Sequence, residues 1–226
     1  MTSRQVAVAA TITIGQSPRP DIVDEIRPVL GPGVHVVEAG ALDGLDRQQI
    51  EAMRPDPGDH ALVTLLRDGR EVLVGHHHVL PRLQACIDRL QDEADVILML
   101  CTGTFPHFAT RRPILYPEQL LFQMARAVAP GVRVGVLTPS GLQIADQARR
   151  WGEVASAVTV QSFSPYTPGG DLDGACAAFR GAAVDVVALD CLGYTLALKE
   201  QVRQQVDRPV LLARTVLARV AAELLD

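Results

Sequence analysis

The chain has 226 residues and a net charge of −5, with 48% apolar and 21% charged residues. This length suits one large domain or two small ones, and the composition is ordinary for an α/β protein. The sequence has no basic cluster, which argues against nucleic acid or an anionic membrane as a partner, and no apolar run reaches the roughly 18–20 residues that cross a bilayer.

Residues 5–14 form a β-branched, apolar run that predicts a first strand. Only Arg4 carries a positive charge ahead of this run, and no small-residue cleavage site follows it, so we do not interpret it as a secretory signal. The four cysteines are therefore expected to be reduced thiols in the cytoplasm.

The first strand leads into Gly15-Gln16-Ser17-Pro18-Arg19-Pro20-Asp21, and a helical pattern of apolar residues follows from Ile22. This is a strand–loop–helix unit. Backbone N–H groups at such a helix N-terminus favour a bound anion, although a simple cap and turn is the alternative.

The rest of the first half predicts a strand at 34–38, a short acidic helix at 41–53 and a loop at 54–59. Two apolar runs, 61–66 and 71–75, flank Asp68-Gly69, which predicts a β-hairpin. A helix at 79–92, a strand at 95–100 and a short extended piece at 114–115 follow.

His76-His77-His78 come directly after the hairpin. Adjacent residues of a strand point to opposite faces, so the three side chains would not share one metal ion from a strand. We favour a polar loop or a subunit contact, and we expect no metal site.

The second half predicts helices at 117–129, 141–151, 172–182, 196–206 and 215–225, with strands at 132–137, 157–162, 184–190 and 209–212. Strands that alternate with helices and are almost wholly apolar indicate a parallel sheet covered on both faces.

A repeat relates the two halves at a constant offset of 90 residues. Ala85, Cys86, Asp95, Val96, Cys101 and Gly103 match Ala175, Cys176, Asp185, Val186, Cys191 and Gly193. The predicted fold is therefore α/β with two pseudo-symmetric halves, each a mostly parallel sheet flanked by helices, and an active-site cleft between them. Residues 1–130 and 208–226 form the first half, with a hairpin insertion near 61–78, and 131–207 form the second.

Cys101 and Cys191 each stand where a strand ends in a glycine turn, the edge at which parallel sheets bind ligands. Neighbouring N–H groups lower the pKa of a thiol toward neutrality, where it serves as a general acid or base. Cys86 and Cys176 lie within predicted helices and are expected to be buried and inert. Asp190 precedes Cys191, but strand alternation turns it to the other face.

The motifs TIGQSPRPD (13–21), LLRDG (65–69) and LDCLGY (189–194) resemble the AroM family, within the aspartate/glutamate/hydantoin racemase superfamily. The resemblance runs over most of the chain. It implies cofactor-independent racemisation or isomerisation of a small carboxylate, with a catalytic cysteine in each half. Residues 101–104 stand where racemases have Cys-Asn-Thr, and Gly193 replaces a histidine or glutamate that often follows the second cysteine.

Cys101 and Cys191 are the expected acid/base pair, and no cofactor is required. The expected substrate contacts are Gln16, Ser17, Arg19, Thr102, Gly103, Thr104, Thr138, Pro139, Ser140, Gly193 and Tyr194. The partner is a small carboxylate. A homodimer is possible, and the segment 61–78 is where we expect its contact.

Two alternatives stay open. One is an isomerase or decarboxylase that uses a single cysteine. The other is a small-carboxylate binding or regulatory protein without turnover.

Overall fold

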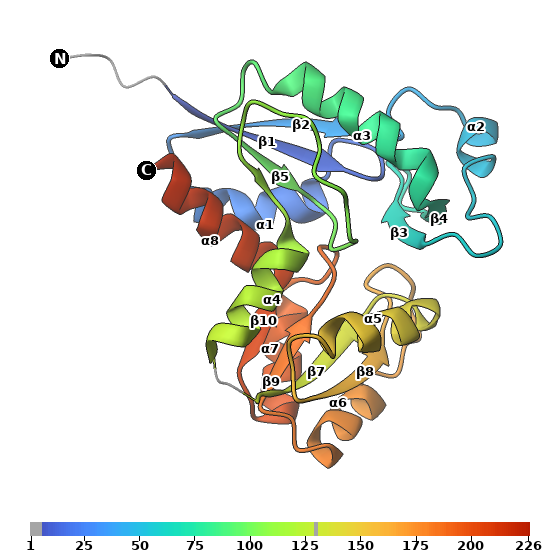
Figure 1. Cartoon of the computed structure of the whole chain (residues 1–226), viewed down its shortest axis with the longest axis vertical. Helices are drawn as coiled ribbons and strands as arrows, with labels where there is room; N and C mark the ends of the chain where they lie inside the picture. The colour runs from blue at the N-terminus through green and yellow to red at the C-terminus, as the bar shows by residue number, and fades with distance from the viewer. Residues whose placement is uncertain (1–5, 129–130) are drawn as a thin grey trace. The chain divides into compact units, whose positions relative to one another are not determined.

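The computed structural model describes residues 6–128 and 131–226. Gln5, the first residue of the predicted strand 5–14, lies outside the described residues. So do residues 129 and 130, where the predicted helix 117–129 and the predicted first half end. The contacts divide the chain into unit 1, residues 1–116 with 217–226, and unit 2, residues 117–216. Each unit contains its own parallel sheet of four strands flanked by helices (Figure 1). The predicted α/β fold of two similar halves is confirmed.

The sheet of unit 1 has the strand order β2-β1-β5-β6, with all neighbours parallel. Its strands are β1 (Ala7–Thr13), β2 (Val34–Gly40), β5 (Val96–Met99) and β6 (Ile114–Leu115). The helices α1 (Pro20–Leu30) and α3 (His76–Leu90) precede β2 and β5. Ala10 and Ile12 of β1 pack in one buried cluster with Leu83 of α3, so the apolar alternation of β1 builds the core.

Unit 1 carries the predicted insertion between β2 and α3. It consists of a short helix α2 (Arg47–Glu51) and an antiparallel hairpin, β3 (Ala61–Leu65) and β4 (Glu71–Gly75). Gly69 of the hairpin turn has a φ of +80°, the left-handed conformation that the Asp-Gly signal predicts.

The sheet of unit 2 has the order β8-β7-β9-β10, again wholly parallel. Its strands are β7 (Arg133–Thr138), β8 (Ala157–Ser162), β9 (Val186–Leu189) and β10 (Val210–Leu212). The helices are α4 (Pro117–Val128), α5 (Ile144–Trp151) after a 3-10 turn (Gly141–Gln143), α6 (Leu172–Gly181) and α7 (Leu196–Val206). Helix α8 (Ala213–Leu225) begins in unit 2 and ends in unit 1.

The two sheets repeat each other at the level of single hydrogen bonds. The Asp95 carboxylate accepts the Val8 N–H at 2.9 Å, and its repeat partner Asp185 accepts the Arg133 N–H at 2.9 Å. Each of these acids lies just before the central strand that leads to a cysteine. The 90-residue offset therefore reflects a repeated structure.

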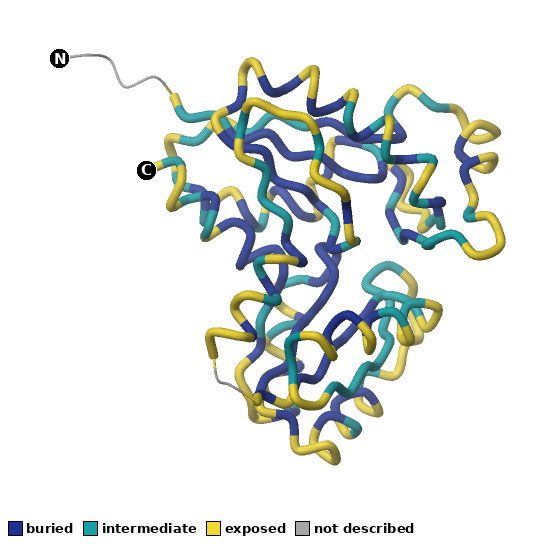
Figure 2. The backbone as a smooth tube through the Cα atoms, in the orientation of Figure 1, coloured by how far each residue is buried: buried dark blue, intermediate teal, exposed yellow. Residues whose placement is uncertain are grey.

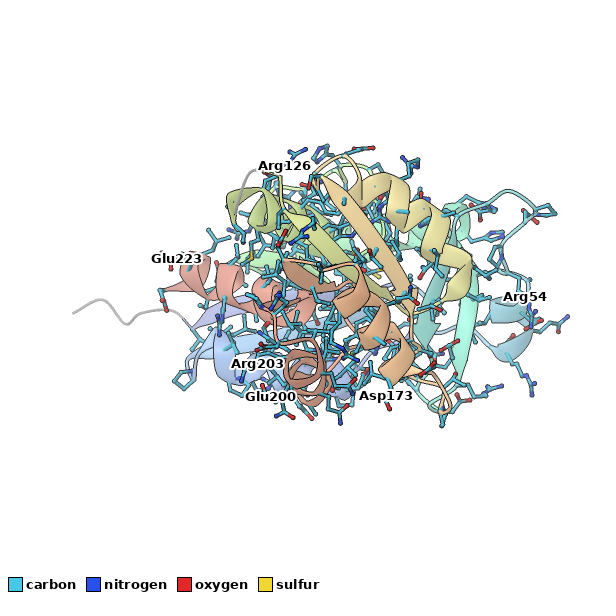
Figure 3. All side chains as sticks on the ribbon, turned by 90° about the horizontal axis from the view of Figure 1, so that it is seen from below. Arg54, Arg126, Asp173, Glu200, Arg203 and Glu223 are labelled. Carbon is cyan, nitrogen blue, oxygen red and sulfur yellow. The ribbon has the colours of Figure 1, made fainter. Side chains whose placement is uncertain are left out.

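Burial is concentrated in the two central strands of each sheet, β1 with β5 and β7 with β9, whereas the edge strands β6 and β8 are only partly buried (Figure 2). The outer face of α7 carries charged pairs such as Arg203 with Glu200 at 3.0 Å, both labelled in Figure 3. Among the described residues, no helix is long and apolar enough to cross a membrane.

Three elements differ from the sequence analysis. Helix α3 begins at His76, so the three histidines form its first turn and not a loop. The acidic helix shrinks to five residues, with Asp46 and Gln49 forming a capping box at its start. Strand β10 pairs with β9 in the second sheet, because α7 returns the chain to the neighbour of β9; the sequence analysis assigned this strand to the first half.

Candidate active site

The first thiol follows β5 at the carboxyl edge of the unit 1 sheet. Ile12 pairs with Met99 in the β1–β5 register, so Cys101 lies beside the loop that ends β1. Its Sγ accepts the N–H of Gly103 at 3.3 Å, and the side chain is partly exposed. This places Cys101 and Gly103 where the strand-end argument predicted.

The second thiol repeats this arrangement in unit 2. Cys191 follows β9, and its Sγ accepts the N–H of Gly193 at 3.3 Å. Leu137 pairs with Leu189, so Cys191 lies beside the loop Pro139-Ser140 that ends β7. Each thiol thus accepts the N–H of the glycine two residues later, at the same distance. An N–H that points at sulfur stabilises a thiolate.

The remaining two cysteines have a different environment. Cys86 in α3 and Cys176 in α6 are buried, and burial raises the pKa of each thiol above its usual value. A raised pKa keeps sulfur protonated and unreactive at neutral pH. Both thiols are buried, as their positions within predicted helices indicated.

Ser17 in the loop after β1 is held by Asp43. The Ser17 hydroxyl donates to Asp43 Oδ2 at 2.6 Å, and its N–H donates to Asp43 Oδ1 at 2.8 Å. The N–H groups of Gly15 and Arg19 donate to Thr13 Oγ1 and to Glu38 Oε2. The expectation of N–H groups open to an anion therefore does not hold for these three residues.

Arg19 is also engaged within its own loop. Its guanidinium forms two hydrogen bonds with the Asp21 carboxylate, at 2.8 and 2.7 Å, and the residue is 4% exposed. A third contact, at 3.3 Å, reaches Thr13 Oγ1. This bidentate pair anchors the start of α1.

Gln16 binds the hairpin turn, since its Oε1 accepts the N–H of Arg67 at 3.0 Å. Arg67 in turn donates to the Ser17 carbonyl and, at 3.0 Å, to Asp43. Gln16 also lines a cavity of about 370 Å³ that contains four arginines. Three of them pair with acids, namely Arg54 with Glu51, Arg67 with Asp43 and Arg70 with Asp68.

The β3–β4 hairpin packs against the two loops that follow β1 and β5. A Cβ on Gly15 would lie 2.3 Å from Thr64 Oγ1, and one on Gly103 would lie 2.9 Å from Leu62 Cδ2. Thr102 is buried, and the Thr104 carbonyl contacts His76 Nε2 at 2.9 Å. A side chain at Gly103 would therefore have to displace the end of the Leu62 side chain in the hairpin.

In unit 2, Thr138 ends β7 fully buried and donates to Gln143 Oε1 at 3.0 Å. Ser140 caps the turn that follows, accepting the N–H of Leu142 at 3.3 Å. Pro139 lies between them, partly exposed.

Tyr194 is fully buried, and its hydroxyl donates to the Phe163 carbonyl at 2.7 Å. Burial, with negative charge on Cys191 and Asp190 as a further cause, raises the pKa of Tyr194 well above its usual value. Its proton therefore stays in place and holds the Cys191 turn to the end of β8. Tyr194 serves this turn as a fixed support.

Tyr166 is a residue that the sequence analysis missed. A Cβ on Gly193 would lie 2.4 Å from Tyr166 Oη and 2.8 Å from Pro165 Cγ, so this loop packs directly on the Cys191 turn. The signal was available, because the loop 164–170 follows β8 at the same carboxyl edge as Cys191.

Arg214 was also missed. This fully buried residue at the start of α8 donates to the Leu192 carbonyl from Nε at 3.0 Å and from Nη2 at 2.6 Å. Arg214 lies between the predicted strand 209–212 and the predicted helix 215–225, and a single arginine in such a connection gives no sign of burial. The turn that presents Cys191 is thus fixed by a buried cation.

Asp190 faces away from the thiol, as strand alternation predicted. Its Oδ2 accepts the indole N–H of Trp151 at 2.8 Å, and both side chains are buried. The carboxylate therefore ties α5 to the sheet.

Two α/β units, each with a thiol at the end of a central parallel strand, define a duplicated α/β architecture. The AroM family model, described as AroM protein, matches residues 9–225. The chain belongs to the AroM family, and the resemblance seen in its motifs is confirmed.

Solved structures give the same fold. Unliganded arylmalonate decarboxylase is 18% identical with a TM-score of 0.64, covering 97% of this chain and 93% of that chain. Maleate isomerase Iso from Pseudomonas putida S16 is 17% identical with a TM-score of 0.62, covering 95% and 90%. Aspartate racemase from Picrophilus torridus is 14% identical with a TM-score of 0.59, covering 96% and 93%. No match is found among the curated proteins.

Proposed function

We propose that the protein is a cofactor-independent isomerase or racemase of a small carboxylic acid, with Cys101 and Cys191 as its acid/base pair. The observation that supports this most is the repeated sulfur environment, an N–H of the second following residue at 3.3 Å from each Sγ. Arylmalonate decarboxylase, maleate isomerase and aspartate racemase, which share the fold, all act on carboxylic acids by name.

The proposed reaction moves one proton at a time. One cysteine thiolate takes the proton from the carbon next to the substrate carboxylate, and the electron pair of that C–H bond passes into an enediolate. The other cysteine, as a thiol, then delivers its proton to the opposite face of the same carbon. The two cysteines have exchanged protonation states, so the reverse reaction begins from the other sulfur.

The enediolate requires hydrogen-bond donors to hold its charge. We assign this role to polar groups of the loops that end the sheets, namely Thr102, Thr104, Ser140 and the hydroxyl of Tyr166. Gln16, Ser17, Arg19 and Thr138 shape the site through their contacts with Arg67, Asp43, Asp21 and Gln143. Pro139, Gly103 and Gly193 are assigned to the lining, and the buried Tyr194 supports the Cys191 turn through its hydrogen bond to the Phe163 carbonyl.

A panel of amino, hydroxy, substituted malonic and substituted maleic acids in D₂O tests the proposal. We expect deuterium at the carbon next to the carboxylate, with inversion, for at least one acid, and Cys86→Ala serves as a control that keeps turnover. Release of CO₂ from a substituted malonate would support the one-cysteine decarboxylase instead. A ligand-induced rise in melting temperature without exchange or turnover for any acid would show a binding protein.

A further inference from the structure

The loop before the hairpin and the first turn of α3 lie side by side in unit 1. The hairpin returns the chain to this loop, because Gly75 N–H donates to the Met53 carbonyl at 2.8 Å and His76 N–H donates to the His60 carbonyl at 3.0 Å. The loop follows Arg54, an exposed residue labelled in Figure 3. Its acids therefore meet the histidines of α3.

Three side chains converge at this point. Asp56, His77 and His78 each place a ligand atom within 4.8 Å of the other two. The distance between Asp56 Oδ2 and His77 Nε2 is 3.6 Å. Two ligands bound to one zinc ion at about 2.0–2.1 Å lie a little over 3 Å apart, so a small movement of exposed side chains closes the site.

A fourth residue orients one of the histidines. His77 Nδ1 lies 2.8 Å from Asp59 Oδ2. A carboxylate that accepts the Nδ1 proton leaves the Nε2 lone pair directed at the ion, an arrangement that zinc-binding histidines commonly have. Gly75 leaves room for the Asp59 carboxylate, since a Cβ at residue 75 would lie 2.4 Å from Asp59 Oδ2.

From this geometry we propose that Asp56, His77 and His78 form a binding site for a divalent transition-metal ion, with Asp59 orienting His77. Two imidazole nitrogens and one carboxylate oxygen favour Zn²⁺, Co²⁺ or Ni²⁺ over Mg²⁺ and Ca²⁺, which prefer oxygen alone. The carboxylates of Asp56 and Asp59 balance the charge of the ion. The three histidines lie in the first turn of α3, which begins at His76, and not on a strand that would point neighbouring side chains to opposite faces.

The bound ion would join the loop to α3. The same first turn contacts the Cys101 loop, through His76 Nε2 and the Thr104 carbonyl at 2.9 Å. The site contains no cysteine, so it is independent of the proposed acid/base chemistry. Its test accordingly uses binding and stability.

Zinc titration by calorimetry of the whole chain, in the wild type and in single variants, tests the site. We expect one zinc ion bound at this site, and at least a tenfold weaker affinity in Asp56→Asn and His77→Gln. Asp59→Asn is expected to weaken zinc binding about tenfold, as loss of an outer-shell partner does. The matched control His35→Gln, an exposed histidine of β2, should bind zinc like the wild type.

A second measurement covers the case of a poorly folded variant. At the same zinc concentration, zinc should raise the melting temperature of the wild type and of His35→Gln by equal amounts, and that of Asp56→Asn by clearly less. If cysteine thiols bound the zinc instead, the zinc affinity would be the same in Asp56→Asn, His77→Gln, Asp59→Asn and His35→Gln. Equal zinc affinity in the wild type and Asp56→Asn would overturn the proposal, because Asp56 would then contribute nothing to zinc binding. Absence of zinc binding by the wild type would overturn it as well.

Discussion

Gly193 shows how one missing side chain shapes the second thiol site. We predict that Gly193→Ala destabilises the protein by about 1–3 kcal/mol, the usual cost of overpacking, because its Cβ would meet the Tyr166 hydroxyl. In a Tyr166→Ala background, Gly193→Ala should lower the free energy of unfolding by less, since Tyr166 supplies two of the three atoms nearest to that Cβ. Urea unfolding of the four proteins in this cycle measures the coupling.

Gly181→Ala is the matched control, because a Cβ at that glycine of α6 meets nothing within 4 Å. It should not destabilise the protein, and the higher helix propensity of alanine could add up to about 1 kcal/mol to the free energy of unfolding. An equal cost of Gly193→Ala with and without the Tyr166 side chain would contradict the packing described here.

Arg214 is the clearest case of a buried charge that supports the site. We expect Arg214→Ala to lower the free energy of unfolding by about 2–3 kcal/mol, because the Leu192 carbonyl loses two hydrogen bonds from a charged donor. Arg219→Ala, an exposed change on the same helix, should stay within about 0.5 kcal/mol of the wild type. Denaturant titration followed by circular dichroism compares the two variants, and equal losses would refute the role of Arg214.

At the scale of elements, the repeated aspartates join the start of each central strand to its neighbour. Arg133 lowers the pKa of Asp185 from 3.8 to about 2, first through its side-chain hydrogen bond and then through its backbone N–H. A depressed pKa in the folded state stabilises the protein above the unfolded value. That contribution is lost as pH falls from about 4 through about 2.

We therefore predict that Asp185→Asn is less stable than the wild type at pH 5, and that the difference shrinks as the pH approaches 2. Arg133→Met should remove only part of this pH dependence, because the N–H of residue 133 still donates to the carboxylate. Urea unfolding at several pH values provides the comparison. A difference that stays constant with pH would show that the ion pair has no such role.

The elements that the sequence predicted best are those defined by a local pattern. The apolar strands, the Asp-Gly hairpin and the turns after Cys101 and Cys191 all lie where their residues indicated. The start of α3 was missed because three histidines carry no apolar periodicity, and helix formation there depends on the contacts of His76 and His77 with Thr104 and Asp59. Local propensity does not contain such tertiary contacts.

The two thiols of the candidate site could be predicted from the sequence, but the residues that hold the surrounding loops in place were harder to predict. A cysteine at the end of a buried strand is visible in one sequence, whereas Asp43 and Arg214 act through partners 26 and 22 residues away. The expectation that the Gly15–Arg19 loop offers open N–H groups failed for the same reason, since Asp43 and Glu38 come from β2 and the turn after it.

At the scale of the whole molecule, the repeat gives each unit one strand-end thiol with the same N–H donor. Such duplication is what a two-sided proton transfer requires, because the proton must leave one face of a carbon and return to the other. Cys101 and Cys191 are therefore equally necessary for the proposed reaction.

The most direct test is the racemisation or isomerisation rate of Cys101→Ser and Cys191→Ser beside Cys86→Ala, using an acid that the wild type converts in D₂O. Our account predicts that both serine variants lose conversion in at least one direction, while Cys86→Ala keeps the wild-type rate. Full conversion in both directions by either serine variant would contradict the acid/base pair.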